Sequence, residues 1–174
     1  VRAKKAGMKL LLDFHYSDTW ADPGKQNMPQ DWKNLNQKEL NIAVENFTRE
    51  SLDKFAKAGA WADAVQIGNE VNGGFMWPLG KTWADGDEKI GGMKAFTTLL
   101  ASASRGVRSS IDGDKSQIVI HLADGADNGL YRYVFDEVKK ARPRILFLYQ
   151  DGAREGKNDL EGIMRCREIA EDID

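Results

Sequence analysis

Cysteine, long apolar runs and an excess of either charge are all missing from this sequence. A single cysteine, Cys166, excludes an intrachain disulfide and a zinc site made of cysteines, and we expect it to be a small core residue of a helix. No window holds the roughly 18 consecutive apolar residues that cross a bilayer. The 25 Lys and Arg residues nearly balance the 27 Asp and Glu residues, for a formal net charge of −2. We therefore expect neither a nucleic-acid nor a membrane partner.

Metal-binding and nucleophile motifs are missing as well. Asp13 and His15 would share one face of a strand, and Asp18 and Asp22 follow closely. No H-E-x-x-H or comparable spacing accompanies them, so we expect no metal and no other cofactor. The serines between residues 102 and 110 lack the glycines of a nucleophile elbow, which disfavours a serine triad.

Short apolar runs alternate with longer helical patterns, which is typical of parallel βα units. Asn36 and Glu39 match a capping box at one helix start, and Gly59 ends that helix. Asp127 is the expected cap of a later helix. The predicted strands cover residues 8–15, 64–69, 117–122 and 145–149, and the predicted helices cover residues 36–59, 93–111, 127–141 and 160–173.

Four such units without a linker or an internal repeat predict one α/β domain over residues 1–174. The pattern leaves two architectures open. A flavodoxin-like open sheet closes at about this size, although its glycine-rich first turn is missing here. Alternatively, the four units are part of a (β/α)8 barrel, which typically takes about 250 residues.

Polar residues stand where three of the apolar runs end. His15 ends the first run, Asn69 and Glu70 end the second, and His121 lies near the end of the third. Each of these residues alone is more often a packing or solvated residue than a functional one. The carboxyl ends of parallel strands meet on one face, where reacting groups gather, so the three together predict a functional site.

Glu70 is the best candidate for acid–base chemistry, because partial burial at a strand end favours the protonated carboxyl that a general acid needs. The neighbouring Asn69 has an amide that can hold a substrate hydroxyl. Aromatic side chains in the loops are expected to offer flat faces on which sugars stack. These are Trp20, Phe75, Trp77 and Trp83. The combination fits a neutral hydroxylated ligand better than a phosphate.

Three segments of this sequence closely resemble the arabinogalactan endo-β-1,4-galactanases. Residues 12–26 read LDFHYSDTWADPGKQ, residues 65–70 read VQIGNE, and residues 77–80 read WPLG. The long first motif is highly specific, whereas the Asn-Glu pair occurs across a whole clan of retaining barrel glycosidases. The segment from Ile118 to Tyr131 also resembles the fifth-strand region of the family, so the resemblance covers about residues 1–140.

The resemblance implies a (β/α)8 barrel of which this chain covers about strands three to six. It implies an extracellular enzyme that cleaves internal β-1,4 bonds of galactan or arabinogalactan with retention of configuration, although no signal peptide is visible in this chain. Glu70 matches the acid/base residue at the end of the fourth strand. The substrate-binding residues that it implies are Asn69, His15, Asp18, Trp20, Trp77 and His121.

Two parts of the family pattern are not found. A retaining mechanism needs a second carboxylate as nucleophile, which the family takes from its seventh strand, and nothing after Asp151 resembles that strand. After Lys140 the aromatic sugar platform that the family carries is replaced by a different sequence. We therefore expect the isolated segment to show little or no hydrolysis.

Other readings remain open. A carbohydrate-binding or decayed protein could keep the fold without the reaction, and a related clan hydrolase could act on xylan, mannan or β-glucan. Part of a barrel would also expose two sheet edges, so self-association of the chain is expected.

Overall fold

A four-stranded parallel sheet forms the centre of the molecule. The computed structural model describes residues 1–87, 89–123, 127–141 and 146–149. The strands are β1 (Leu11–Phe14), β2 (Ala64–Ile67), β5 (Gln117–Leu122) and β6 (Leu146–Tyr149), paired in the order β1-β2-β5-β6. The spatial order follows the chain order without the reversal of a flavodoxin-like sheet, so the four strands are a sector of a (β/α)8 barrel.

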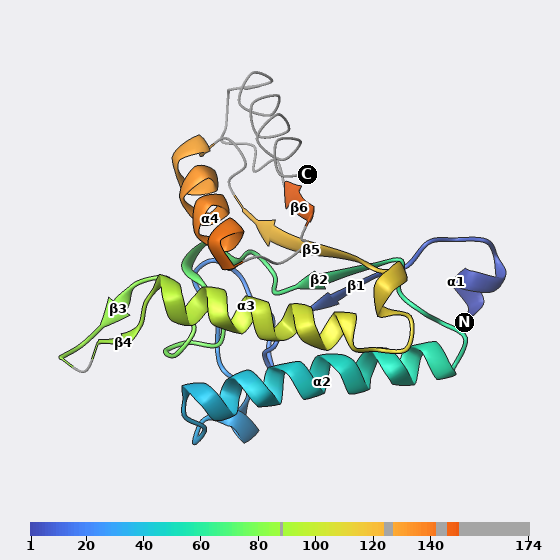
Figure 1. Cartoon of the computed structure of the whole chain (residues 1–174), viewed down its shortest axis with the longest axis horizontal. Coiled ribbons are helices and arrows are strands. Elements are labelled where there is room, and N and C mark those ends of the chain that lie inside the picture. Colours follow the sequence, from blue (N-terminus) through green and yellow to red (C-terminus); the bar gives the residue numbers. More distant parts are fainter. Residues whose placement is uncertain (88, 124–126, 142–145, 150–174) are drawn as a thin grey trace.

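Helices connect the strands, as βα units require (Figure 1). Helix α1 (Arg2–Lys5) precedes β1, α2 (Gln37–Lys57) joins β1 to β2, α3 (Met93–Arg108) joins β2 to β5, and α4 (Asn128–Ala141) joins β5 to β6. Helices α2 and α3 lie side by side along one face of the sheet. Short 3-10 turns η1 (Gln30–Trp32), η2 (Val71–Gly73) and η3 (Gly113–Lys115) and the hairpin β3 (Ala84–Asp85)–β4 (Ile90–Gly91) lie in the connections.

The ends of the helices follow from local chemistry. Asn36 accepts hydrogen bonds from the backbone of Lys38 and Glu39, and the Glu39 side chain accepts one from the Asn36 N–H, so the predicted capping box is confirmed. Gly59 after this helix has φ +74°, a conformation that favours glycine. The predicted cap at Asp127 is confirmed by its bond to the Leu130 N–H at 2.9 Å.

The two faces of the sheet differ in chemistry. The face toward the helices is apolar, with side chains in or against the core: Leu12, Phe14, Val65, Ile67, Ile118, Ile120 and Leu122. The opposite face, which in a barrel lines the interior, carries Asp13, Gln66 and His121. Alternation along the strands therefore places polar groups inside the barrel, directly below the ends of the strands.

Several element bounds differ from the sequence prediction. The strand expected over residues 64–69 ends at Ile67, because Gly68 turns the chain with φ +93°. The first strand is limited to Leu11–Phe14, and the β3–β4 hairpin was not predicted. The expected helix over residues 160–173, Cys166 and the segment after residue 149 lie outside the described residues. Among the helices of the described part, none is long and apolar enough to span a bilayer.

Candidate active site

The loop after β1 begins with an imidazole whose two nitrogens both bind protein atoms. The backbone N–H of Ala21 donates to His15 Nδ1 at 3.1 Å, so the ring proton lies on Nε2, which contacts Asp13 Oδ2 at 3.1 Å. Burial raises the pKa of Asp13, and the nearby His15 offsets part of this effect. His15 thus fixes the path of the loop and binds the carboxyl on the inner face of the sheet.

Asn69 connects the ends of two strands with the loop after β1. Its side chain is buried, and its Nδ2 donates to the Ala21 carbonyl at 2.8 Å. Because Nδ2 is the donor end, Oδ1 is an acceptor, and it receives His121 Nδ1 at 2.8 Å and Gln66 Nε2 at 3.2 Å. Three of the four hydrogen-bonding positions of the amide are thereby filled. No described residue accepts the second Nδ2 hydrogen.

Glu70 follows in a backbone conformation that is uncommon for a residue with a side chain. Its φ of 49° and ψ of 52° are left-handed, and the preceding Gly68 is confined, since an added Cβ would lie 2.5 Å from Val71 Cγ1. The Glu70 side chain is half-buried, and its carboxylate has no hydrogen-bond or ion-pair partner among the described residues. A carboxyl in this position is available to a bound substrate.

The aromatic residues of the two long loops differ in exposure. Trp20 is 71% exposed, and its ring lies 4.8 Å from that of His15. Trp77 packs edge-on against Trp83 at 5.5 Å and donates its indole N–H to the Gly73 carbonyl. The expectation for Phe75 is wrong: this side chain is fully buried, where it packs against Phe96 and Tyr16, and it offers no face to a ligand.

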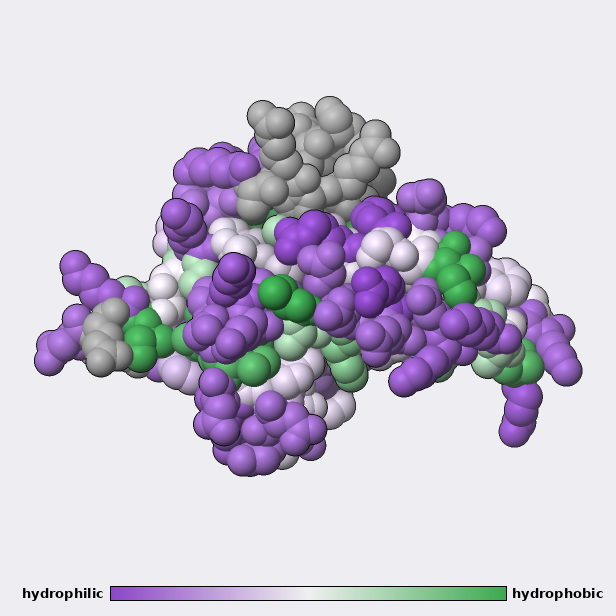
Figure 2. Space-filling view, turned by 60° about the horizontal axis from the view of Figure 1, so that its bottom comes forward, coloured by the Kyte–Doolittle hydropathy of each residue, from purple (hydrophilic) through white to green (hydrophobic). Residues whose placement is uncertain are grey.

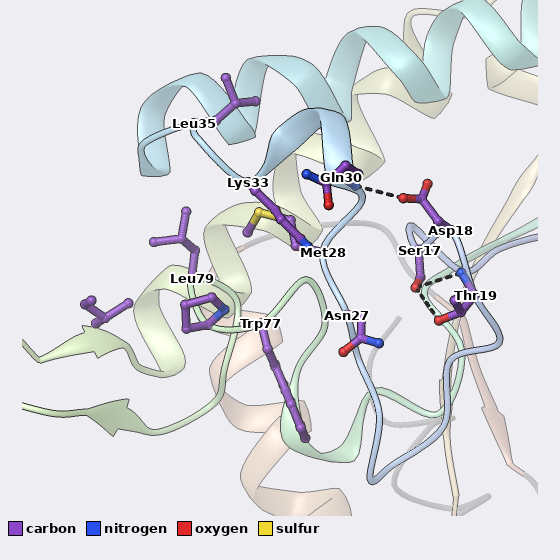
Figure 3. A pocket seen from close by; sticks show the side chains of 12 residues that line it. Ser17, Asp18, Thr19, Asn27, Met28, Gln30, Lys33, Leu35, Trp77 and Leu79 are labelled. Carbon is purple, nitrogen blue, oxygen red and sulfur yellow. Dashed lines mark hydrogen bonds between the residues drawn. The ribbon is translucent and has the colours of Figure 1, made fainter.

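A pocket of about 600 Å³ opens between the loop after β1 and the loop after η2 (Figure 3). Asp18, Asn27 and Gln30 give it polar walls, and Trp77 and Leu79 give it apolar ones. The Asp18 carboxylate accepts the Gln30 N–H at 2.8 Å, which holds the loop in shape. Neither Glu70 nor Asn69 lines this pocket, so the pocket does not contain the predicted acid/base residue.

The predicted site residues therefore form two groups. Asn69, His121 and His15 are connected, the last through Ala21, next to Glu70. Asp18 and Trp77 line the pocket, and the ring of Trp20 contacts that of His15. Sequence reasoning missed Gln66, although its place two residues beyond Ala64 on the inner face was a signal for it. Among the described residues, no three His, Cys, Asp or Glu side chains lie close enough to hold a metal ion.

Comparisons with known proteins identify one family. Among curated relatives, the chain is 37% identical over 145 residues to a probable arabinogalactan endo-beta-1,4-galactanase A of Neosartorya fischeri (83% of this chain, 38% of the relative). It is 42% identical over 127 residues to an arabinogalactan endo-beta-1,4-galactanase of Humicola insolens (71% and 35%).

Solved structures give the same result. The Ignisphaera aggregans GH53 catalytic domain matches with a TM-score of 0.70 and 40% identity, over 80% of this chain and 36% of that one. A structure described as one of two fungal beta-1,4-galactanases matches with a TM-score of 0.72 and 37% identity, over 83% and 41%. The chain thus spans less than half the length of these relatives. The model described as Glycosyl hydrolase family 53 matches residues 1–145. With the family model, the curated relatives and the solved structures in agreement, this chain belongs to glycosyl hydrolase family 53.

Proposed function

We propose that the protein containing this chain hydrolyses internal β-1,4-galactosidic bonds of galactan or type I arabinogalactan, with Glu70 as the acid/base residue. The observation that carries the proposal is the environment of Glu70. Its carboxylate is unpartnered within the described part of the chain, while the adjacent Asn69 is fixed by bonds to Ala21, Gln66 and His121. In this proposal, residues 1–174 form one part of a catalytic barrel domain.

The reaction begins with a proton transfer. In a retaining mechanism, the protonated Glu70 gives its proton to the glycosidic oxygen as the bond to the sugar breaks, and it later takes a proton from the attacking water. The nucleophile must be a second carboxylate about 5–5.5 Å away. We assign it to a strand other than the four described here, so the described part of the chain supplies the acid/base residue and not the nucleophile.

Substrate binding uses the groups around Glu70. The remaining Nδ2 hydrogen of Asn69 donates to a sugar hydroxyl, and His15 and His121 border the reacting unit. The exposed ring of Trp20 stacks on a sugar face. Asp18 and Trp77 hold a further sugar in the pocket. A polysaccharide is too large to enter a cell, so we expect the enzyme to act outside the cell.

The activity is tested by comparing Glu70→Gln with Glu50→Gln in the complete gene product. Glu50 lies on the surface of α2, where its closest cation is Arg49 at 3.7 Å. We expect Glu70→Gln to lower the release of reducing ends from galactan by about 10²–10⁴-fold, the usual contribution of a general acid, and Glu50→Gln to leave it unchanged. Circular dichroism checks that both variants fold.

Two results would contradict the proposal. Binding of galacto-oligosaccharide without reducing-end release, unaffected by Glu70→Gln, would indicate a non-catalytic or decayed protein. Faster release from xylan, mannan or β-glucan than from galactan would indicate a related hydrolase with another substrate.

A further inference from the structure

The side chain of Gln26 binds the backbone of the segment that carries Glu70. Gln26 is 1% exposed, and its Nε2 lies 2.8 Å from the Asn69 carbonyl, 3.0 Å from the Asp22 carbonyl and 3.3 Å from the Glu70 carbonyl. Three carbonyls share the two hydrogens of the amide. The reverse orientation would set Oε1 against three carbonyl oxygens, so the contacts identify the nitrogen end.

The main chain of the same residue binds the other side of the turn. The Gln26 carbonyl accepts the Trp77 N–H at 2.8 Å, and Asn27 forms a parallel bridge with Trp77. Residues 26 and 27 therefore contact the chain both before and after η2. The segment from Asn69 to Trp77 is attached to the loop after β1 at each of its ends.

The attachment lies at a residue whose backbone conformation is unfavourable. Glu70 has a left-handed backbone, which is unfavourable for a residue with a Cβ and persists only when the surroundings determine it. The carbonyls of Asn69 and Glu70 lie beyond the end of β2, so the sheet ladder does not supply their donors. The Nε2 of Gln26 supplies a donor to both.

The two ends of the Gln26 amide differ. Its Oε1 is buried and accepts no hydrogen bond from any described residue, which is unfavourable. A methionine of similar length would fill the same space without an unpaired acceptor, but it would leave the carbonyls of Asp22, Asn69 and Glu70 without their shared donor. The donor end of Gln26 is therefore the part of the side chain on which the backbone at Asn69 and Glu70 depends.

We propose that Gln26 is a positioning residue: its amide holds the Asn69 and Glu70 carbonyls so that the Glu70 carboxyl points at the glycosidic oxygen. The inference rests on the proposed function of Glu70. It predicts a defect limited to the step that needs the proton, because Gln26 acts through the backbone of the acid and does not touch the substrate.

The test compares Gln26→Met with Thr48→Val in the complete gene product. Thr48 is equally buried and hydrogen-bonded, to Tyr16 at 2.7 Å, but it lies on α2 away from Glu70, so it controls for the loss of a buried polar group. One substrate is galactan, whose leaving group needs a proton. The other is a 2,4-dinitrophenyl β-galactobioside, whose phenolate leaves without one.

We expect Gln26→Met to lower kcat/KM on galactan by about 100-fold, the effect of a small misplacement, and on the aryl substrate by about threefold or less. Thr48→Val should change neither. Equal losses on both substrates, or no loss on galactan, would overturn the role of Gln26 while leaving the activity established. If Gln26→Met does not fold, Gln26→Glu replaces it, because only the protonated carboxyl of this variant can donate. The ratio of galactan to aryl activity rises as the pH falls in the unmodified protein as well, since Glu70 must be protonated, so we expect a steeper rise in Gln26→Glu. The same pH dependence of the ratio in both proteins would overturn the inference.

Failure of the proposed function gives a different result. In that case the unmodified protein cleaves neither substrate, and Gln26 is judged by hydrogen–deuterium exchange of the backbone amides over residues 69–77. Faster exchange of this segment in Gln26→Met than in Thr48→Val supports the attachment, and equal exchange contradicts it.

Discussion

His121 and Asn69, at neighbouring strand ends, are joined by a hydrogen bond of 2.8 Å between His121 Nδ1 and Asn69 Oδ1. The donor comes from β5, and the acceptor belongs to the residue before Glu70. Because Oδ1 accepts from His121, the amide of Asn69 keeps its nitrogen turned toward Ala21. Strand β5 thereby orients the side chain of Asn69, which follows strand β2.

This relationship predicts the effect of replacing His121 in the complete gene product. His121→Phe removes a donor to the buried Asn69 oxygen, at an expected cost of about 1–3 kcal/mol, or roughly 5- to 150-fold in kcat/KM on galactan. His121→Gln, which retains an N–H donor, should lose less. Steady-state kinetics measures both variants, and an equal loss in the two would show that the bond to Asn69 is not the reason.

The pair Asp13 and His15 predicts a pH dependence of stability. Burial raises the folded-state pKa of Asp13 above 3.8, with His15 and His121 opposing the effect, so the folded chain binds more protons in the window just above pH 3.8. The contribution of Asp13 to stability is fully present below pH 3.8 and is lost as the pH rises through the folded-state pKa. Asp13→Asn should remove this loss of stability with rising pH. At pH values above the folded-state pKa of Asp13, the variant should therefore be more stable than the unmodified chain.

Asp63→Asn is the matched control, because the pKa of Asp63 is shifted in the opposite direction. The side-chain bond to Lys4 and the N–H of Leu10 lower the pKa of Asp63, so its contribution is present above pH 3.8 and is lost as the pH falls through the folded-state value. Urea unfolding between pH 3 and 6, at low chain concentration, measures all three proteins. If Asp13→Asn leaves the dependence of the unfolding free energy on pH unchanged, the pH effect does not come from Asp13.

The open edge of the sheet predicts self-association of the 174-residue chain produced alone. Strand β1 ends the described sheet, and Leu11 on it is 49% exposed. The face seen in Figure 2 gives weaker reasons to associate, since hydrophilic side chains cover most of it and hydrophobic ones form small separate patches. Size-exclusion chromatography with light scattering should detect dimers or larger species.

Leu11→Lys should shift this distribution toward the monomer, because a charged side chain on an edge strand disfavours pairing. Met8→Lys is the control, since Met8 is 61% exposed but lies before the strand. A monodisperse monomer of the unmodified chain would contradict the prediction.

The regular elements were predictable wherever the local pattern and the packing agree. The strand over residues 117–122 has its predicted bounds, and α2 begins at the predicted cap because both depend on residues close in sequence. The β3–β4 hairpin was missed since two-residue strands carry no periodic signal. Phe75 was misplaced because the composition of a loop does not reveal which of its aromatics turns inward.

The sequence by itself determined the alternation of strands and helices, the polar residues at the strand ends and the motifs of a galactanase-like segment, because these depend on residue type and short spacing. The tertiary structure decided which groups meet. Gln26 reaches the Asn69 carbonyl across 43 residues, and His121 reaches the Asn69 side chain across 52. Such contacts form only when parallel strands are paired in register and a long loop closes over their ends, and local sequence carries no information about that closure.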